Sequence, residues 1–132
     1  MQELVGKSID TVSELAQKFI PSDISEKIGN RMADGEKTYV FSSDAAKIIN
    51  ELSRVKGMTP ASSRDLKDSV PIFKLKDGTV VSRYQNPARF EHVFISDKDG
   101  KFIFGGYVGW VHNAGLLNKL QELSEKYGYY GE

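Results

Sequence analysis

The sequence predicts an α+β fold, with N-terminal helices packed on an antiparallel sheet of two β-hairpins, followed by a C-terminal helix. Apolar residues recur at helical spacing in the first half of the chain and again near its end. Between those segments, apolar and polar residues alternate on both sides of Asp77-Gly78 and of residues 96–100, a pattern typical of β-hairpins. The length of 132 residues suits one hydrophobic core, so we expect a single domain over residues 1–132.

Two helices are expected at the start of the chain. The first has an apolar stripe within residues 9–20, follows Ser8, which is a good N-cap, and ends at Pro21. The second begins with the capping-box-like pattern at Asp23 and ends near Gly35. Both are amphipathic, so each is expected to bury one face against the sheet.

A short strand, a helix and a loop are expected next. Residues 37–41 are β-prone and can add an edge strand. Ser42-Ser43-Asp44 then offers N-caps for a helix over residues 45–55, which Gly57 ends. Residues 58–69 consist of Ser, Thr, Pro and charged residues without periodicity, which predicts a loop.

The first hairpin is expected over residues 72–84. Its turn is Asp77-Gly78, the dipeptide that suits the positive φ angles of a two-residue type I′ turn. The pairs expected from that turn are Leu75 with Val80 and Phe73 with Ser82.

The second hairpin pairs residues 90–95 with residues 102–104 around a longer loop. The simplest register places His92 opposite Gly105, where the missing side chain would leave room for a ligand. Glycines follow in the second strand and indicate a bulge or a close backbone approach. A final helix is expected to begin with Asn113 as its N-cap and to end at Gly128.

The composition excludes several classes of function. Lys plus Arg and Asp plus Glu both number 18, so the chain as a whole has no net field for nucleic acid or an anionic membrane, and such binding would need a local basic patch. The absence of cysteine excludes disulfides and thiolate catalysis, and favours the cytoplasm. No apolar stretch approaches the roughly 20 residues that span a bilayer. We expect no membrane partner, no secretory signal, no metal and no cofactor.

The residues with the clearest chemical potential are His92 and His112, with Arg83, Arg89 and Tyr107 near them in sequence. Because imidazole titrates near neutrality, one histidine can act as general base and the other as general acid across a phosphodiester. A cation or a phenol can stabilise the charge that grows on the phosphoryl oxygens. This is the chemistry of metal-independent RNA cleavage by the 2′-hydroxyl of the substrate. The two histidines are therefore the predicted catalytic pair, and the other three residues are the predicted substrate-binding residues.

Two motifs contain these histidines: Phe90-Glu91-His92-Val93-Phe94 and, after a glycine-rich strand, Trp110-Val111-His112-Asn113. Together they resemble the two-histidine segment of EndoU-type endoribonucleases, over residues 90–113. The resemblance implies a small metal-independent endoribonuclease in which His92 and His112 form the acid and base pair. A looser similarity of layout to small bacterial toxin ribonucleases implies a toxin-type enzyme with RNA as its partner.

Other interpretations remain open. His92 can be an ordinary strand histidine, and His112 can help to cap the final helix. The aromatic residues of the second hairpin are expected to lie mostly in the core, although an exposed one can stack on a base. The chain can instead be a non-enzymatic binding module, such as an inhibitor, immunity or adaptor protein, that binds a protein partner through an exposed aromatic or strand-edge surface. Ser-His-Asp and paired-carboxylate catalysis are left undecided, because only geometry distinguishes them.

Overall fold

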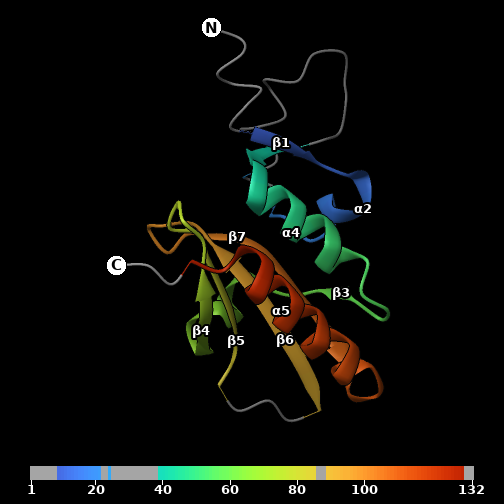
Figure 1. The fold of residues 1–132 in the computed structure, drawn as a ribbon. Helices are drawn as coiled ribbons and strands as arrows, with labels where there is room; N and C mark the ends of the chain where they lie inside the picture. The colour runs from blue at the N-terminus through green and yellow to red at the C-terminus, as the bar shows by residue number, and fades with distance from the viewer. Residues whose placement is uncertain (1–8, 22–23, 25–38, 86–88, 130–132) are drawn as a thin grey trace, which may run out of the picture.

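A five-stranded antiparallel sheet is the main element of the computed structural model, which describes residues 9–21, 24, 39–85 and 89–129. The strand order is β3-β7-β6-β5-β4 (Figure 1). The strands are β3 (Thr59–Pro60), β4 (Ser69–Lys74), β5 (Val80–Tyr84), β6 (Phe90–Ser96) and β7 (Phe102–Gly109). The predicted α+β class and its antiparallel sheet of two hairpins are confirmed.

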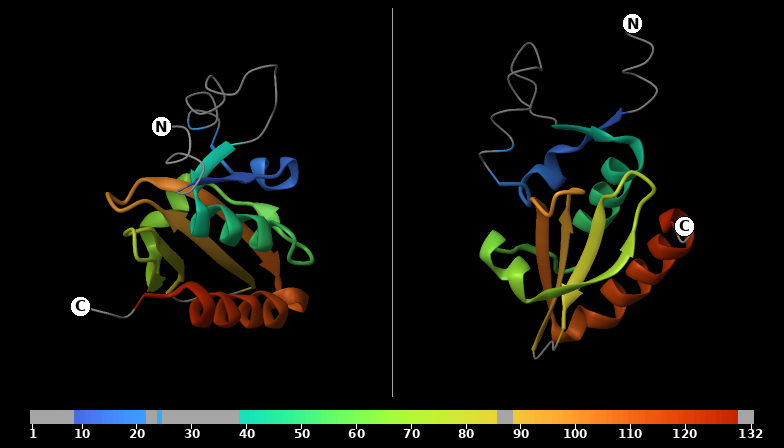
Figure 2. Two further views of the ribbon diagram at one scale, coloured as in Figure 1. Left: turned by 45° about the horizontal axis from the view of Figure 1, so that its top comes forward. Right: turned by 90° about the vertical axis from the view of Figure 1, so that its left-hand side faces the viewer.

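Helices and a second, two-stranded sheet surround this main sheet. These elements are β1 (Ile9–Val12), α2 (Glu14–Gln17), β2 (Tyr39–Ser42), α4 (Ser43–Ser53), η2 (Ser63–Asp68), η3 (Trp110–His112) and α5 (Asn113–Tyr127). Helix α5 packs on one face of the main sheet, and the 3-10 helix η2 lies on the other side (Figure 2). The backbone of Gly105 in β7 donates to the carbonyl of Phe19, which ties the N-terminal elements to the main sheet.

The expected helix over residues 9–20 is wrong in its first part. Residues Ile9–Val12 form strand β1, which pairs with β2, and the helical segment that follows covers only Glu14–Gln17. A tertiary contact explains the difference. The side chain of Asn50 accepts from the backbone of Ser13 at 2.8 Å and donates to the carbonyl of Thr11 at 3.2 Å, and this holds the segment extended. β-Branched residues in the segment favour the same conformation.

The other expectations for the first half have mixed outcomes. The helix expected over residues 45–55 is confirmed as α4, and the strand expected at residues 37–41 is found as β2, although it pairs with β1 and not with the main sheet. The helix expected from Asp23 to Gly35 lies outside the described residues, apart from Ile24. The loop expected over residues 58–69 is wrong in part, because it contains strand β3 and the 3-10 helix η2.

The turn of the first hairpin differs from the two-residue turn expected. The nitrogen of Leu75 donates to the carbonyl of Thr79, which leaves three residues in the loop, and Gly78 adopts a φ of 97°. A three-residue loop with glycine in the left-handed region is the next most common hairpin connection. The register consequently differs from the expected one, and the observed pairs are Lys74 with Val80 and Phe73 with Val81.

The register of the second hairpin also differs from the expected one. His92 pairs with Tyr107, and the residue opposite Gly105 is Phe94. The hairpin loop closes where the nitrogen of Asp97 donates to the carbonyl of Lys101, and the register shifts between Ile95 and Ser96. The sequence does not show where an irregularity of this kind shifts the pairing of two strands. The space opposite His92 is therefore filled by a phenol ring.

The final helix is confirmed as α5, with Gly128 directly after its last residue. Its start differs by one residue, because the 3-10 turn η3 precedes it. Asn113 is the first helical residue and His112 occupies the N-cap position, without a side-chain capping hydrogen bond.

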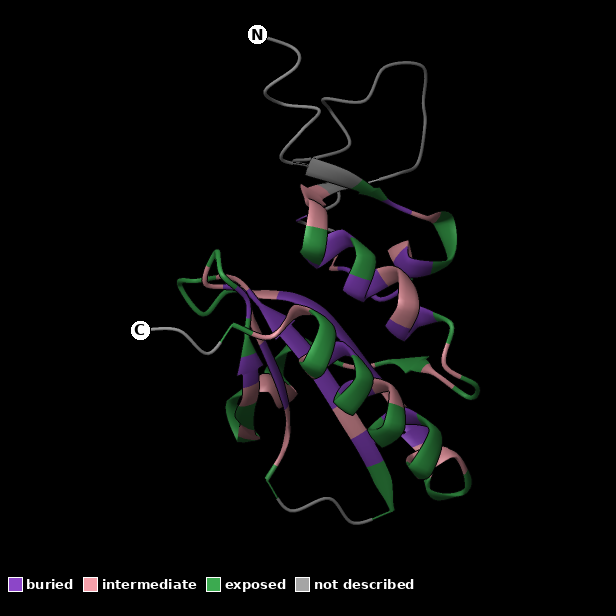
Figure 3. Cartoon of the chain, viewed as in Figure 1, coloured by how far each residue is buried: buried purple, intermediate pink, exposed green. Residues whose placement is uncertain are grey.

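Strand alternation gives the main sheet two different faces. The α5 face is the apolar core, where Val81, Val93 and Ile95 pack with leucines of α5. The opposite face, which we call the aromatic face, carries Tyr84, Phe90, His92, Phe94, Phe102 and Tyr107. Figure 3 shows buried residues along β6 and β7, and exposed residues on the outer side of α5 and at the start of β6.

Gly57 is a position at which we expect the fold to tolerate a side chain poorly. It has a φ of 86°, and a Cβ added to it would lie 2.4 Å from Cδ2 of His112. Gly100 has a similar φ of 84° but open space around it. We expect Gly57→Ala to lower the free energy of unfolding more than Gly100→Ala, which should lose only the ~1–2 kcal/mol of a left-handed non-glycine residue.

Urea denaturation of both variants measures this difference. Adding His112→Ala to Gly57→Ala should recover part of the loss, because it removes the clashing ring. Equal losses in the two glycine variants would show that the contact with His112 does not matter to stability.

Candidate functional site

His92 lies on the aromatic face, between tyrosines from the two neighbouring strands. The ring of Tyr84 in β5 stacks on the imidazole with centroids 4.0 Å apart, and the ring of Tyr107 in β7 lies 5.1 Å away on its other side. In both pairs the angle between the two ring planes is only 28°. The two rings therefore fix the orientation of the imidazole.

Burial also controls the charge of His92. Its Nδ1 atom is buried and makes no hydrogen bond of good geometry. Burial lowers the pKa of His92 below its usual value of 6.5, although the carboxylate of Asp65, the carbonyl of Phe90 and the carboxylate of Glu91 each favour the charged form. His92 is consequently neutral at pH 7 and can accept a proton only in more acidic solution.

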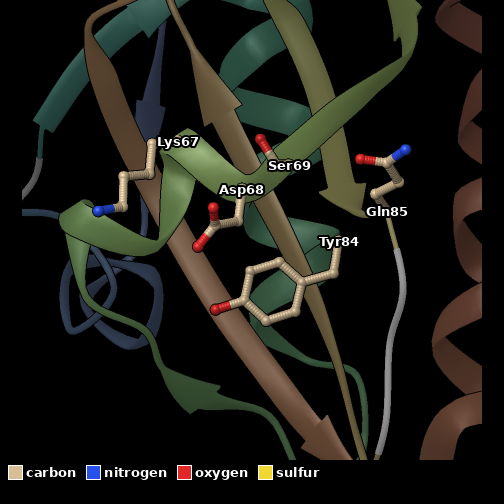
Figure 4. Close-up of a pocket in the computed structure, with 5 residues that line it drawn as sticks. All are labelled: Lys67, Asp68, Ser69, Tyr84 and Gln85. Carbon is tan, nitrogen blue, oxygen red and sulfur yellow. The ribbon is translucent and has the colours of Figure 1, made fainter.

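An open polar cavity of about 450 Å³ lies beside this stack. It is lined by Lys67, Asp68, Ser69, Tyr84 and Gln85, where η2 leads into β4 (Figure 4). Figure 4 shows Asp68 and Tyr84 projecting into the same space, with Lys67 and Gln85 on opposite sides. Burial raises the pKa of Tyr84, and nearby carboxylates add to the shift, so its phenol stays protonated at neutral pH. Neither histidine lines this cavity.

His112 lies in a different environment from His92. It ends the 3-10 turn η3, and its ring packs directly against the backbone of Gly57, in the connection between α4 and β3. Strand β7 lies between β6, which carries His92, and β3. Among the described residues, no hydrogen bond or ring contact joins the two imidazoles.

The predicted substrate-binding residues are also divided. Arg83 donates from Nε and from one terminal nitrogen to the two carboxylate oxygens of Glu91, each at 2.9 Å. This ion pair lies on the α5 face, because Arg83 borders a groove against α5 and Glu91 alternates with His92 along β6. Arg89 is exposed at the start of β6. Of the predicted site residues, the structure brings only His92 and Tyr107 into contact.

Sequence reasoning missed several partners of these residues. Tyr84 and Asp65 lie near His92, yet they come from a different hairpin and from a segment expected to be a loop. Glu91 could have been recognised, because it shares its face with Val93 and Ile95 and a carboxylate buried to 2% exposure needs a partner. No signal in the sequence marks Asp65, since its approach depends on η2.

No protein-family model, curated protein or solved structure matches this chain. The resemblance of residues 90–113 to EndoU-type endoribonucleases therefore stays a prediction from the sequence. Within the described part of the chain, no helix is long and apolar enough to cross a membrane. The same residues contain no group of three or more His, Cys, Asp or Glu side chains that could hold a metal ion.

The lowered pKa of His92 predicts a pH dependence of stability. The unfolded chain takes up a proton near pH 6.5 and the folded chain takes it up only at lower pH, so the free energy of unfolding should fall as pH drops below 6.5. His92→Phe keeps an aromatic ring in the stack and should flatten that fall. Urea midpoints across this pH range measure it. An unchanged slope in His92→Phe would contradict the assignment.

The Arg83–Glu91 ion pair predicts an asymmetry between two substitutions. Arg83→Met leaves the carboxylate of Glu91, which is 2% exposed, without its partner, whereas Glu91→Leu does the same to the guanidinium of Arg83, which is 30% exposed. Removing one partner of a buried pair costs about 3 kcal/mol or more. We therefore expect Arg83→Met to approach that loss and Glu91→Leu to lose clearly less.

Chemical denaturation of both variants and of the double variant measures the coupling between them. The double variant should be more stable than Arg83→Met alone, because no unpaired charge remains. A greater loss in Glu91→Leu than in Arg83→Met would contradict this account.

Proposed function

We propose that this chain is a non-enzymatic binding module that docks a protein partner through one end of its main sheet. That end, which we call the Trp110 end, consists of Phe90, Trp110 and Val111. Their exposed fractions are 47%, 71% and 63%. Gly109 pairs with Phe90 across β6 and β7, and Trp110 follows Gly109 directly, so these side chains lie at the same end of the sheet. This clustering is the observation that carries the proposal.

Exposed aromatic residues of this kind are typical of protein interfaces. Trp and Tyr are enriched among the residues that contribute most to binding, and contiguous apolar patches on a monomer usually mark an interaction site. Phe90 is held in place by an edge-to-face contact with Tyr107, whose ring centroid lies 5.4 Å away. A rigid aromatic anchor loses little conformational entropy when it is buried by a partner.

The strand edges of the main sheet are less suited to binding. Strand β3 at one edge has only two residues, and one of them is Pro60, which has no N–H to donate. Strand β4 at the other edge contains Pro71 and a register irregularity, and the carbonyl of Lys74 already accepts from Tyr129. Short strands, prolines and bulges protect edges from added strands. The Trp110 end is therefore favoured over strand addition.

The placement of the histidines supports binding over RNA cleavage. A general acid and a general base must both reach one phosphodiester. His92 is enclosed between Tyr84 and Tyr107, while His112 packs on Gly57. Arg83, which would hold the phosphate, is paired with Glu91.

The proposal is tested by crosslinking followed by measured binding. A photo-crosslinking amino acid in place of Val111 identifies the partner in source cells, and the purified partner is then titrated against the chain and its variants. Trp110→Ala should weaken binding by at least about thirtyfold, which corresponds to the ~2 kcal/mol of a strong interface residue. Leu15→Ala is the matched control, because Leu15 is 40% exposed on α2, and it should leave the affinity unchanged.

Two outcomes would overturn the proposal. One is a partner whose affinity is the same for Trp110→Ala and the parent chain. The other is cleavage of labelled RNA in EDTA that is lost in both His92→Ala and His112→Ala, which would support the metal-independent endoribonuclease instead.

A further inference from the structure

We infer that the partner docked at the Trp110 end presents an acidic segment with an apolar or aromatic anchor. The inference rests on the proposed function and adds the chemical class of the partner. It comes from charges that the sequence separates and the fold brings together around Phe90, Trp110 and Val111. Charge complementarity favours an acidic partner, because a positively charged surface attracts acidic groups and repels basic ones.

Three segments supply those charges. The ring of His112 packs on Gly57, which brings the connection after α4, with Arg54 and Lys56, to the start of α5. Phe90 pairs with Gly109, which brings Arg89 to the same end. Arg54, Lys56 and Arg89 are all exposed.

Acidic residues are absent from these segments. None occurs in residues 54–59, 89–90 or 109–118, and the first turn of α5 has none. Two acids close to these segments in sequence are already engaged, since Glu51 pairs with Lys119 and Glu91 pairs with Arg83. The Trp110 end is thus locally positive in a chain whose formal net charge is zero.

An acidic protein segment fits this surface better than a single-stranded nucleic acid. Nucleic-acid affinity grows with the number of phosphates neutralised, and about three cations neutralise few of them at physiological salt. The aliphatic side chain of Val111, 63% exposed beside Trp110, adds apolar surface that a base or phosphate does not need. A protein partner uses both the anchor and the charges.

The test uses synthetic probes and the single tryptophan of the chain, Trp110, whose fluorescence reports directly on contact with this end. The probes are an acidic peptide of Asp, Glu and Phe, a peptide with Lys in place of each acid, and a uridine homopolymer. The acidic peptide should quench or shift the Trp110 emission, bind at least about tenfold more tightly than the basic peptide, and weaken as salt rises. Its binding should exceed that of the homopolymer.

Charge reversal at the same surface provides the variants. Lys56→Glu combined with Arg89→Glu should weaken binding of the acidic peptide by about tenfold, because each change replaces an attraction with a repulsion at an exposed site. Lys98→Glu combined with Lys101→Glu is the matched control. It reverses the same number of charges on exposed residues in the loop at the other end of β6 and β7, and should leave the affinity unchanged.

The outcomes separate this inference from the proposed function. Equal binding of acidic and basic peptides, or no effect of the double reversal, would overturn the acidic partner while leaving docking at Trp110 intact. Tighter binding of the uridine homopolymer would overturn it in favour of nucleic acid. A crosslinked protein partner insensitive to Trp110→Ala would overturn the proposed function itself.

Discussion

The pairing of β6 with β7 is the constraint on which the rest of the structure depends. It places Gly105 and Gly106 opposite the apolar centre of β6, and neither position has room for a side chain. A Cβ on Gly106 would lie 2.5 Å from the sulfur of Met58, and one on Gly105 would lie 2.6 Å from the ring of Phe102. The missing side chain of Gly106 lets Met58 and β3 approach β7, and that of Gly105 leaves room for the ring of Phe102. The backbone of Gly105 contacts two segments, since its nitrogen donates to the N-terminal elements and its carbonyl accepts from the segment after β3.

The same pairing places reactive side chains that are adjacent in the sequence in different environments. Glu91 and His92 are adjacent, yet strand alternation sends the carboxylate to the α5 face and the imidazole to the aromatic face. The buried carboxylate then pairs with the partly exposed Arg83 on the α5 face, while the imidazole stacks between two tyrosines. The two polar clusters share the backbone of β6 but lie on opposite sides of the sheet. A cluster of reactive residues in one short stretch of strand is thus divided between two environments.

Most of the fold class could be predicted from the sequence, because it depends on local patterns. The apolar stripes of α4 and α5 and the alternation of the hairpins are such patterns. The errors occur where a distant contact decides the local structure. Asn50 holds the segment before Ser13 extended, and bulges near Pro71 and Ser96 shift the registers. No residue type near those positions specifies how many residues the loop will contain.

The candidate site was less predictable, because it depends on those strand registers and on the sum of the charges near the site. A shift of two residues replaced an open space opposite His92 with the ring of Tyr107. The overall charge balance concealed a different property. Equal numbers of positive and negative residues describe the whole chain, whereas the field near one end of it depends on the residues that lie there. Ion pairs such as Lys119 with Glu51 neutralise charge within the fold, whereas the exposed Arg54, Lys56 and Arg89 lie in segments without acidic residues near Trp110. A neutral chain can therefore present a charged surface wherever folding pairs its acids elsewhere.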